Sequence, residues 1–167
     1  MAAGCKRTLQ LEVLSEDGES IVLEGNLQDP FHDITVNLTI EKQEMRIKSA
    51  FGRMDRVPYP VGCSTSLYRL EEAVGIEIRQ GLSRNLRGAL GGRLGCPYLV
   101  EIAEQICRFA LVVIKSDEAR QLIDAGENAR FIRLKEEMGL CAGHTLARVE
   151  ELPDWLKQEM RGKKHDQ

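Results

Sequence analysis

The first third of the chain alternates apolar and polar residues. The alternation is clear over residues 9–13 and 34–40, and shorter apolar runs lie at 21–23 and 45–51. A period of two is typical of a strand with one buried face. The pattern predicts an antiparallel sheet of three or four strands, with Phe51 on the same face as Met45 and Ile47.

The spacing of apolar residues changes after Pro58-Tyr59-Pro60, because two prolines in three residues are unfavourable in helices and central strands. From there the spacing is helical. It predicts a helix over 67–74 that ends at Gly75, a short one over 82–90, and a long one from Pro97 to about Ile114. The fold class expected is α+β, with these helices packed on one face of the sheet.

We expect three parts along the chain. Residues 1–115 form the α+β domain, residues 116–160 form a helical extension packed on the same domain, and residues 161–167 form a flexible polar tail. A chain of 167 residues is long enough for one domain with a proper core.

Composition and charge exclude several classes of function. The chain is 43% hydrophobic and 29% charged, with a net charge of -3, which gives no overall attraction for nucleic acid or an anionic membrane. Neither a signal-peptide core nor an apolar run of bilayer length is present, so a cytoplasmic location is expected. A protein partner and a homodimer stay open as alternatives.

The cysteines supply the candidate chemistry. Five cysteines, an odd number at irregular spacing, indicate reduced thiols or metal ligands rather than a disulfide framework. Cys63 and Cys96 each directly precede a predicted helix, where unpaired backbone N–H groups favour the thiolate that binds metals. Cys107 is expected to pack in the core. Cys141 and His144 have a C-x-x-H spacing, which by itself is more typical of a turn.

His32 and Asp33 could complete a metal site. His32 has the parity of Ile34, so its imidazole is expected on the core side, where with two thiolates it would suit zinc or an iron–sulfur cluster. Asp33 could provide an oxygen ligand or hold the imidazole. In an extended segment, however, Asp33 points to the opposite face.

The segment from Arg79 to Val100 contains no acidic residue. Arg84, Arg87 and Arg93, beside the glycines of 88–95, predict a surface that binds an anion or an acidic partner without metal. This is the alternative to a metal site. A third hypothesis, a thiol enzyme using Cys63 or Cys96 with His32, has less support, since the common catalytic motifs are absent.

Residues 27–111 resemble a bacterial family of uncharacterised proteins. Its pattern is present here as His32-Asp33, Pro60, Cys63, Gly91-Gly92 and Gly95-Cys96, followed by Tyr98 where that family usually has His. The resemblance implies no activity.

A more distant resemblance is to the U-type iron–sulfur cluster assembly scaffolds. Residues 29–38 are similar to their Asn-Pro-x-Cys-Gly-Asp segment and the strand that follows, with His32 in place of the first cysteine. Gly62-Cys63 and Cys96 correspond to their second and third cysteines. The resemblance implies that His32, Asp33, Cys63 and Cys96 converge on one site, and it favours a non-catalytic, scaffold-like protein that binds a metal or an iron–sulfur cluster.

Overall fold

The computed structural model describes residues 4–124, 154 and 157. The chain divides into two compact units, Met1–Ile114 and Lys115–Gln167. The first unit contains all of the candidate residues considered below. Cys141 and His144, the helices expected beyond Gly126 and the polar tail lie outside the described residues.

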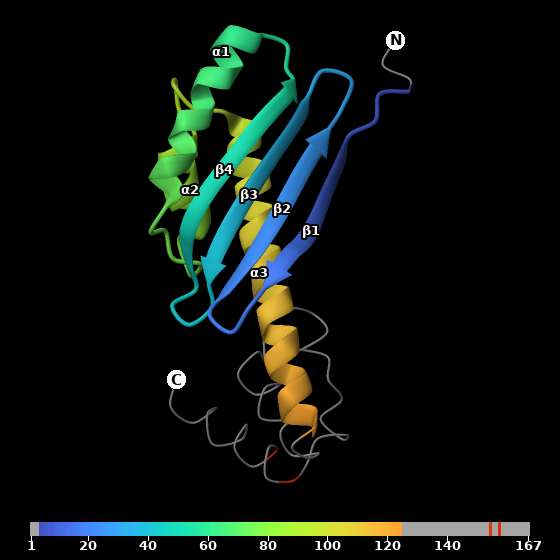
Figure 1. The fold of residues 1–167 in the computed structure, drawn as a ribbon, viewed down its shortest axis with the longest axis vertical. Coiled ribbons are helices and arrows are strands. Elements are labelled where there is room, and N and C mark those ends of the chain that lie inside the picture. The colour runs from blue at the N-terminus through green and yellow to red at the C-terminus, as the bar shows by residue number, and fades with distance from the viewer. Residues whose placement is uncertain (1–3, 125–153, 155–156, 158–167) are drawn as a thin grey trace. The chain divides into compact units, whose positions relative to one another are not determined.

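Four antiparallel strands form one sheet in sequential order (Figure 1). They are β1 (Thr8–Glu16), β2 (Ser20–Gln28), β3 (Asp33–Glu41) and β4 (Arg46–Arg56). Alternate residues of β2 and β3 are buried, as their period of two predicts. The first hairpin turns at Glu16-Asp17-Gly18, where the Asp17 carboxylate accepts hydrogen bonds from the backbone N–H groups of Glu19 and Ser20.

A β-bulge in β4 changes which of its residues face the core. Thr39 pairs with Ser49, but Ile40 pairs with Ile47, so Lys48 is an extra residue on this strand. A bulge shifts the alternation by one residue. Ala50 is therefore buried and Phe51 is 69% exposed, so the prediction that Phe51 faces the core was wrong.

The helices cover one face of the sheet, as predicted, and the fold is α+β (Figure 1). They are α1 (Pro60–Thr65), the 3₁₀ helix η1 (Ser66–Ala73), α2 (Leu82–Leu90) and α3 (Pro97–Asp124). α3 packs so closely on β2 that a Cβ atom at Gly25 would lie 2.7 Å from a methyl carbon of Ile102. The buried side chains of the sheet and the helices form one hydrophobic core.

Two helices differ from the sequence prediction. Pro60 takes the first position of a helix, where a missing N–H costs nothing, so α1 begins before Cys63 rather than after it. α3 continues past Ile114 to Asp124, since neither glycine nor proline occurs before Gly126. Despite this length, none of the helices in the described residues is long and apolar enough to span a membrane.

Candidate functional site

A turn of four residues between β2 and β3 holds a buried carboxylate next to a buried histidine. The backbone N–H of Asp29 donates to the carbonyl oxygen of His32 at 2.9 Å. Oδ1 of Asp29 accepts hydrogen bonds from the backbone N–H groups of Phe31 and His32, both at 2.8 Å. It also lies 3.0 Å from Nδ1 of the His32 ring. Asp followed by Pro is a sequence that favours such a turn.

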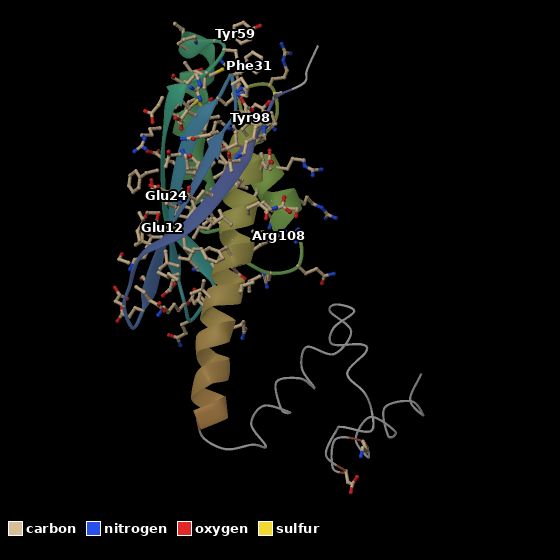
Figure 2. The ribbon with its side chains drawn as sticks, turned by 90° about the vertical axis from the view of Figure 1, so that its right-hand side faces the viewer. Glu12, Glu24, Phe31, Tyr59, Tyr98 and Arg108 are labelled. Atoms are coloured by element: carbon tan, nitrogen blue, oxygen red, sulfur yellow. The ribbon has the colours of Figure 1, made fainter. Side chains whose placement is uncertain are left out.

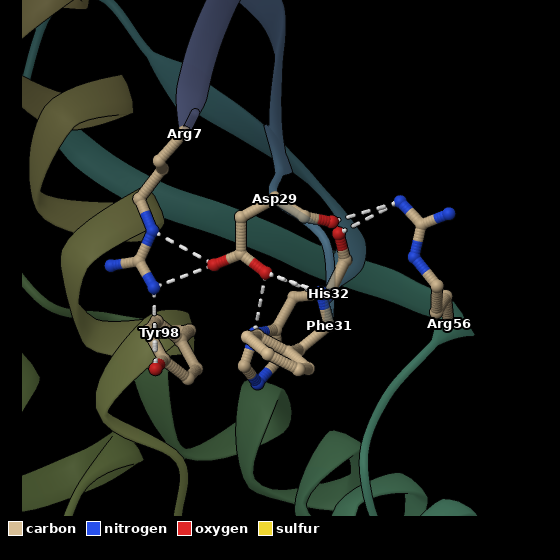
Figure 3. Close-up of polar contacts among 6 residues, drawn as sticks. All are labelled: Arg7, Asp29, Phe31, His32, Arg56 and Tyr98. Carbon is tan, nitrogen blue, oxygen red and sulfur yellow. Dashed lines mark hydrogen bonds and ion pairs between the residues drawn. The ribbon is translucent and has the colours of Figure 1, made fainter. Parts of the chain in front are cut away.

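Two arginines from distant parts of the chain hold this turn from opposite sides (Figure 3). Arg7 donates from Nε and Nη2 to Oδ2 of Asp29, at 2.9 and 2.6 Å. Arg56, at the end of β4, donates to the carbonyl oxygens of Asp29 and His32 at 3.0 and 3.3 Å. The turn is therefore fixed both through its side chain and through its backbone.

The Asp29 carboxylate stays ionised despite its burial. Burial alone would raise its pKa. The hydrogen bonds from the backbone of Phe31, the guanidinium of Arg7 and the ring and backbone of His32 outweigh this effect and hold the pKa of Asp29 well below its ordinary range. A carboxylate without a proton can only accept hydrogen bonds.

The ionised carboxylate determines the tautomer of His32. Since Asp29 can only accept, the proton must lie on Nδ1 of His32. In the neutral ring the lone pair is therefore on Nε2, which has no hydrogen-bond partner among the described residues. Only 9% of His32 is exposed. The arrangement is that of a histidine held by a carboxylate, with one nitrogen left for a further contact.

His32 lines a pocket of about 470 Å³ together with Cys63 and Cys96. Four segments form its wall: the β2–β3 turn with the start of β3, the end of β4 with residues 57–59, α1 with the first residue of η1, and residues 95–98 at the start of α3. Most of the remaining lining is apolar and includes Ile34, Met54 and Val57. The structure thus brings together the three donors that are far apart in the sequence.

The two thiols occupy different positions relative to their helices. Cys63 is the fourth residue of α1, and its backbone N–H donates to the carbonyl oxygen of Tyr59 at 2.8 Å, so the expectation that it directly precedes a helix was wrong. Cys96 does directly precede α3, and its carbonyl oxygen accepts a hydrogen bond from Val100 at 3.3 Å. Both side chains are half-buried.

Tyr98, the second residue of α3, connects the histidine to Arg7. Its ring centroid lies 4.3 Å from that of His32, with the ring planes tilted by 51°. Its hydroxyl oxygen accepts a hydrogen bond from Nη2 of Arg7 at 3.3 Å, and the guanidinium also lies 4.8 Å from the ring centroid (Figure 3). Tyr98 therefore limits how far the imidazole can move.

Asp33 does not belong to this pocket. Its carboxylate accepts hydrogen bonds from the side-chain amides of Asn26, at 3.0 Å, and Gln28, at 3.3 Å, on the uncovered face of the sheet. The reason is that neighbouring residues of an extended segment point to opposite faces. Asp29 provides the contact with the imidazole that was considered for Asp33.

The described part of the chain contains no preformed metal site. No group of three His, Cys, Asp or Glu side chains within it is arranged so that it could hold an ion. His32, Cys63 and Cys96 line one pocket, but they do not form a set of ligands there.

The predicted arginine surface is shallow and only partly gathered. Arg84 and Arg87 border one depression of about 730 Å³ with Gly88 and Gly92, and Arg93 does not line it. A neighbouring depression places Arg87 beside acidic residues of α3, Glu101 and Glu104. None of the three arginines is buried. A role in binding an anion or an acidic partner stays a prediction.

Four residues of the site were not assigned a role from the sequence: Arg7, Asp29, Arg56 and Tyr98. The Asp29-Pro30 pair could have indicated the turn and its side-chain acceptor. Nothing local could have indicated that Arg7 is its partner, since the two lie 22 positions apart.

Comparisons with known proteins identify a family for this chain but do not indicate a function. The family model described as a protein of unknown function, DUF2889, matches residues 6–111. No curated protein and no solved structure matches the chain.

Proposed function

The chain belongs to DUF2889, a family of unknown function. On the basis of the pocket around His32, we propose that the protein binds a small, mainly apolar molecule with one hydrogen-bonding group. The observation that carries this proposal is the pocket of about 470 Å³ whose lining is mostly apolar and includes one anchored imidazole. Pockets for small molecules commonly measure about 300 to 1,000 Å³ and combine apolar walls with a few polar groups that set orientation.

His32 is the group that would recognise the polar end of the ligand. With Nδ1–H donated to Asp29, the neutral ring offers Nε2 as an acceptor for a hydroxyl or N–H group. The protonated ring would instead donate from Nε2 to an anionic ligand. In either state the ring orientation is preserved, because Asp29 and Tyr98 contact it from two sides.

Exposed apolar side chains beside the pocket fit the apolar part of such a ligand. Tyr59 lines the pocket and is largely exposed, and Phe31 and Val61, each next to this region in the sequence, are exposed as well. Figure 2 shows Phe31, Tyr59 and Tyr98 at the same end of the sheet. Aromatic rings at the mouth of a pocket provide contact area for a ligand that extends out of it.

Binding of p-cresol and toluene tests the proposal, since the two molecules differ in shape mainly by one hydroxyl group. We expect p-cresol to shift the amide NMR resonances of Cys63, Cys96 and Tyr98, and to bind roughly tenfold more tightly than toluene, which is the value of one net hydrogen bond. The His32→Ala variant is expected to lose this preference. Arg84→Ala is the matched control, because Arg84 lies outside the pocket.

Two results would overturn the proposal. One is that neither probe shifts a resonance of the pocket at millimolar concentration. The other is that p-cresol keeps its advantage over toluene in the His32→Ala variant, because the hydroxyl would then be recognised elsewhere.

A second candidate, a zinc ion or an iron–sulfur cluster, rests on the same three donors. An imidazole and two thiolates are suitable ligands for either group, and His32, Cys63 and Cys96 line one pocket. The side chains would have to rearrange, since they form no ligand set in the described part of the structure. A site of this kind would fit the resemblance to the U-type scaffolds.

Elemental analysis of protein purified without a histidine tag tests the second candidate. We expect about one zinc, or iron with sulfide, per chain, and its loss from the Cys63→Ser, Cys96→Ser double variant. Cys5→Ser is the control, because Cys5 is exposed and lies outside the pocket. Metal kept at full occupancy in the double variant, or metal absent from the unaltered protein, would exclude this candidate.

A further inference from the structure

We propose that Cys96 is a nucleophile that accepts an acyl group from an activated apolar ester or thioester, with His32 as the base. This inference rests on the proposed function, since the apolar part of the acyl group would occupy the same pocket. It assigns a covalent step to Cys96, which in the binding proposal only lines the pocket.

A tight glycine turn places Cys96 at the edge of the pocket. Gly92 has a φ of +79°, and a side chain at Gly95 would overlap the carbonyl oxygens of Leu90 and Gly91. The backbone N–H of Cys96 then donates to the carbonyl oxygen of Leu90 at 2.9 Å. The Gly-Gly-x-x-Gly-Cys sequence is therefore needed to close the chain back on α2 before α3 begins.

The start of α3 supplies donors for negative charge next to the sulfur. Pro97, the first residue of α3, has no N–H, and the backbone N–H groups of Tyr98 and Leu99 have no partner among the described residues. Such groups, together with the helix dipole, favour an anion at this position. They are placed to stabilise the oxyanion that forms when the Cys96 sulfur attacks a carbonyl group.

A base that points into the same pocket is the independent second feature. His32 is buried, its Nδ1 is held by Asp29, and its Nε2 is unpartnered. Its ring contacts that of Tyr98, two residues after Cys96. A thiol, a base and a carboxylate that orients the base are the parts used in nucleophilic acyl transfer. No hydrogen bond joins either pocket sulfur to His32 in the structure, and such bonds commonly tighten only when substrate binds.

The other described cysteines lack this combination. Cys63 lies inside a helix of six residues, with its carbonyl oxygen accepting a hydrogen bond from the Ser66 hydroxyl. Cys107 is completely buried in the core, and burial raises the pKa of its thiol to about 12. Cys5 is exposed and lies outside the pocket.

The chemical step balances without an added oxidant or reductant. The Cys96 sulfur attacks the carbonyl carbon, and its proton passes to Nε2 of His32. The bond from the carbonyl carbon to the leaving oxygen or sulfur breaks, and the leaving group departs as an anion or takes the proton from His32. Water or another nucleophile then releases the acyl group from the thioester on Cys96.

Acylation by p-nitrophenyl butyrate tests the inference on the full chain. We expect a burst of about one equivalent of p-nitrophenolate, one butyryl group per chain by mass spectrometry, and its location on the peptide that contains Cys96. Cys96→Ala should abolish the label, and Cys5→Ala should keep it, because Cys5 is exposed and lies outside the pocket. Both His32→Ala and His32→Gln should slow acylation about 100-fold, which is the low end of the rate loss caused by removing a general base. Added p-cresol should also slow it.

The outcomes separate this inference from the proposed function. If p-cresol binds but no butyryl group is found on Cys96, or if acylation keeps its rate in both His32 variants, the nucleophile assignment is overturned and the binding pocket stands. If Cys96 is acylated in a His32-dependent reaction while p-cresol neither binds nor competes, the assignment stands and the proposed ligand class is wrong.

Discussion

The two faces of the sheet hold their carboxylates in different ways. On the covered side, Asp29 is buried and accepts hydrogen bonds from two backbone N–H groups, Arg7 and the His32 ring. On the uncovered side, Asp33 lies in a small polar depression with Glu12 and Glu24, and within the described part of the chain it accepts hydrogen bonds from two amide side chains. Figure 2 shows Glu12 and Glu24 on the side of the sheet away from α3.

The difference shows what burial requires of a charge. A carboxylate that leaves water loses its hydration, and enough donors must replace it if the group is to stay ionised. Asp29 has such donors, and they position the imidazole as well. Asp33 remains near water and needs none of them. The covered side therefore holds a buried, ionised carboxylate in a fixed position, whereas Asp33 on the uncovered side accepts hydrogen bonds from neutral side-chain amides.

The largest expected effect on stability is the loss caused by neutralising Asp29, compared with neutralising Asp33. Asp29→Asn removes a buried acceptor from its charged partners, and we expect it to lower the free energy of unfolding by about 3 kcal/mol. Asp33→Asn, the matched control, should change it by no more than about 0.5 kcal/mol. Urea unfolding measures both. Equal losses would break the comparison between the two faces.

Acid should remove the same stabilisation gradually. Because the pKa of Asp29 is lowered in the folded protein, the unfolded chain binds a proton more readily, so protonation favours unfolding. The stabilisation is present above about pH 4, near the ordinary pKa of an unfolded aspartate, and is lost as the pH falls toward the folded-state pKa. When urea unfolding is measured from pH 6 to pH 2, the free energy of unfolding of the unaltered protein should fall toward that of the Asp29→Asn variant. A constant difference at every pH would contradict this prediction.

Packing on the covered face gives the next effect. A methyl group at Gly25 would lie 2.7 Å from a carbon of Ile102 on α3, so Gly25→Ala should destabilise the fold by about 1 to 3 kcal/mol. Gly18→Ala is the control, because a methyl group at Gly18 meets no atom within 4 Å. Thermal unfolding of the two variants compares them. A similar melting temperature for both would mean that α3 can shift away from β2.

The smallest effect is expected at the outer edge of the network. Tyr98→Phe keeps the ring beside His32 and removes only the hydroxyl that accepts from Arg7, so about 0.5 kcal/mol should be lost. Tyr59→Phe is the control, since the exposed Tyr59 hydroxyl makes no hydrogen bond among the described residues. A loss as large as that of Asp29→Asn would show that the hydroxyl is part of the buried network.

The strands, and the face of the sheet to which His32 points, could be predicted from the sequence. The period of two over residues 34–40 extends back to His32, and the structure has this side chain buried, as expected. The same reasoning failed at Phe51, because the bulge at Lys48 leaves no mark on the apolar pattern. It also failed at Cys63, where Pro60 begins a helix that had been expected to start later.

Much of the local order along this chain thus follows from the sequence alone: alternation selects the strands and the buried faces of β2 and β3, and the glycines before Cys96 permit the turn that starts α3. The meeting of Arg7, Asp29, His32 and Tyr98 was decided only by the tertiary structure. The physical reason is that periodicity assigns a side chain to a face but does not say which distant donor will lie opposite it. That choice depends on how the helices pack along the sheet and on which buried charges need partners there.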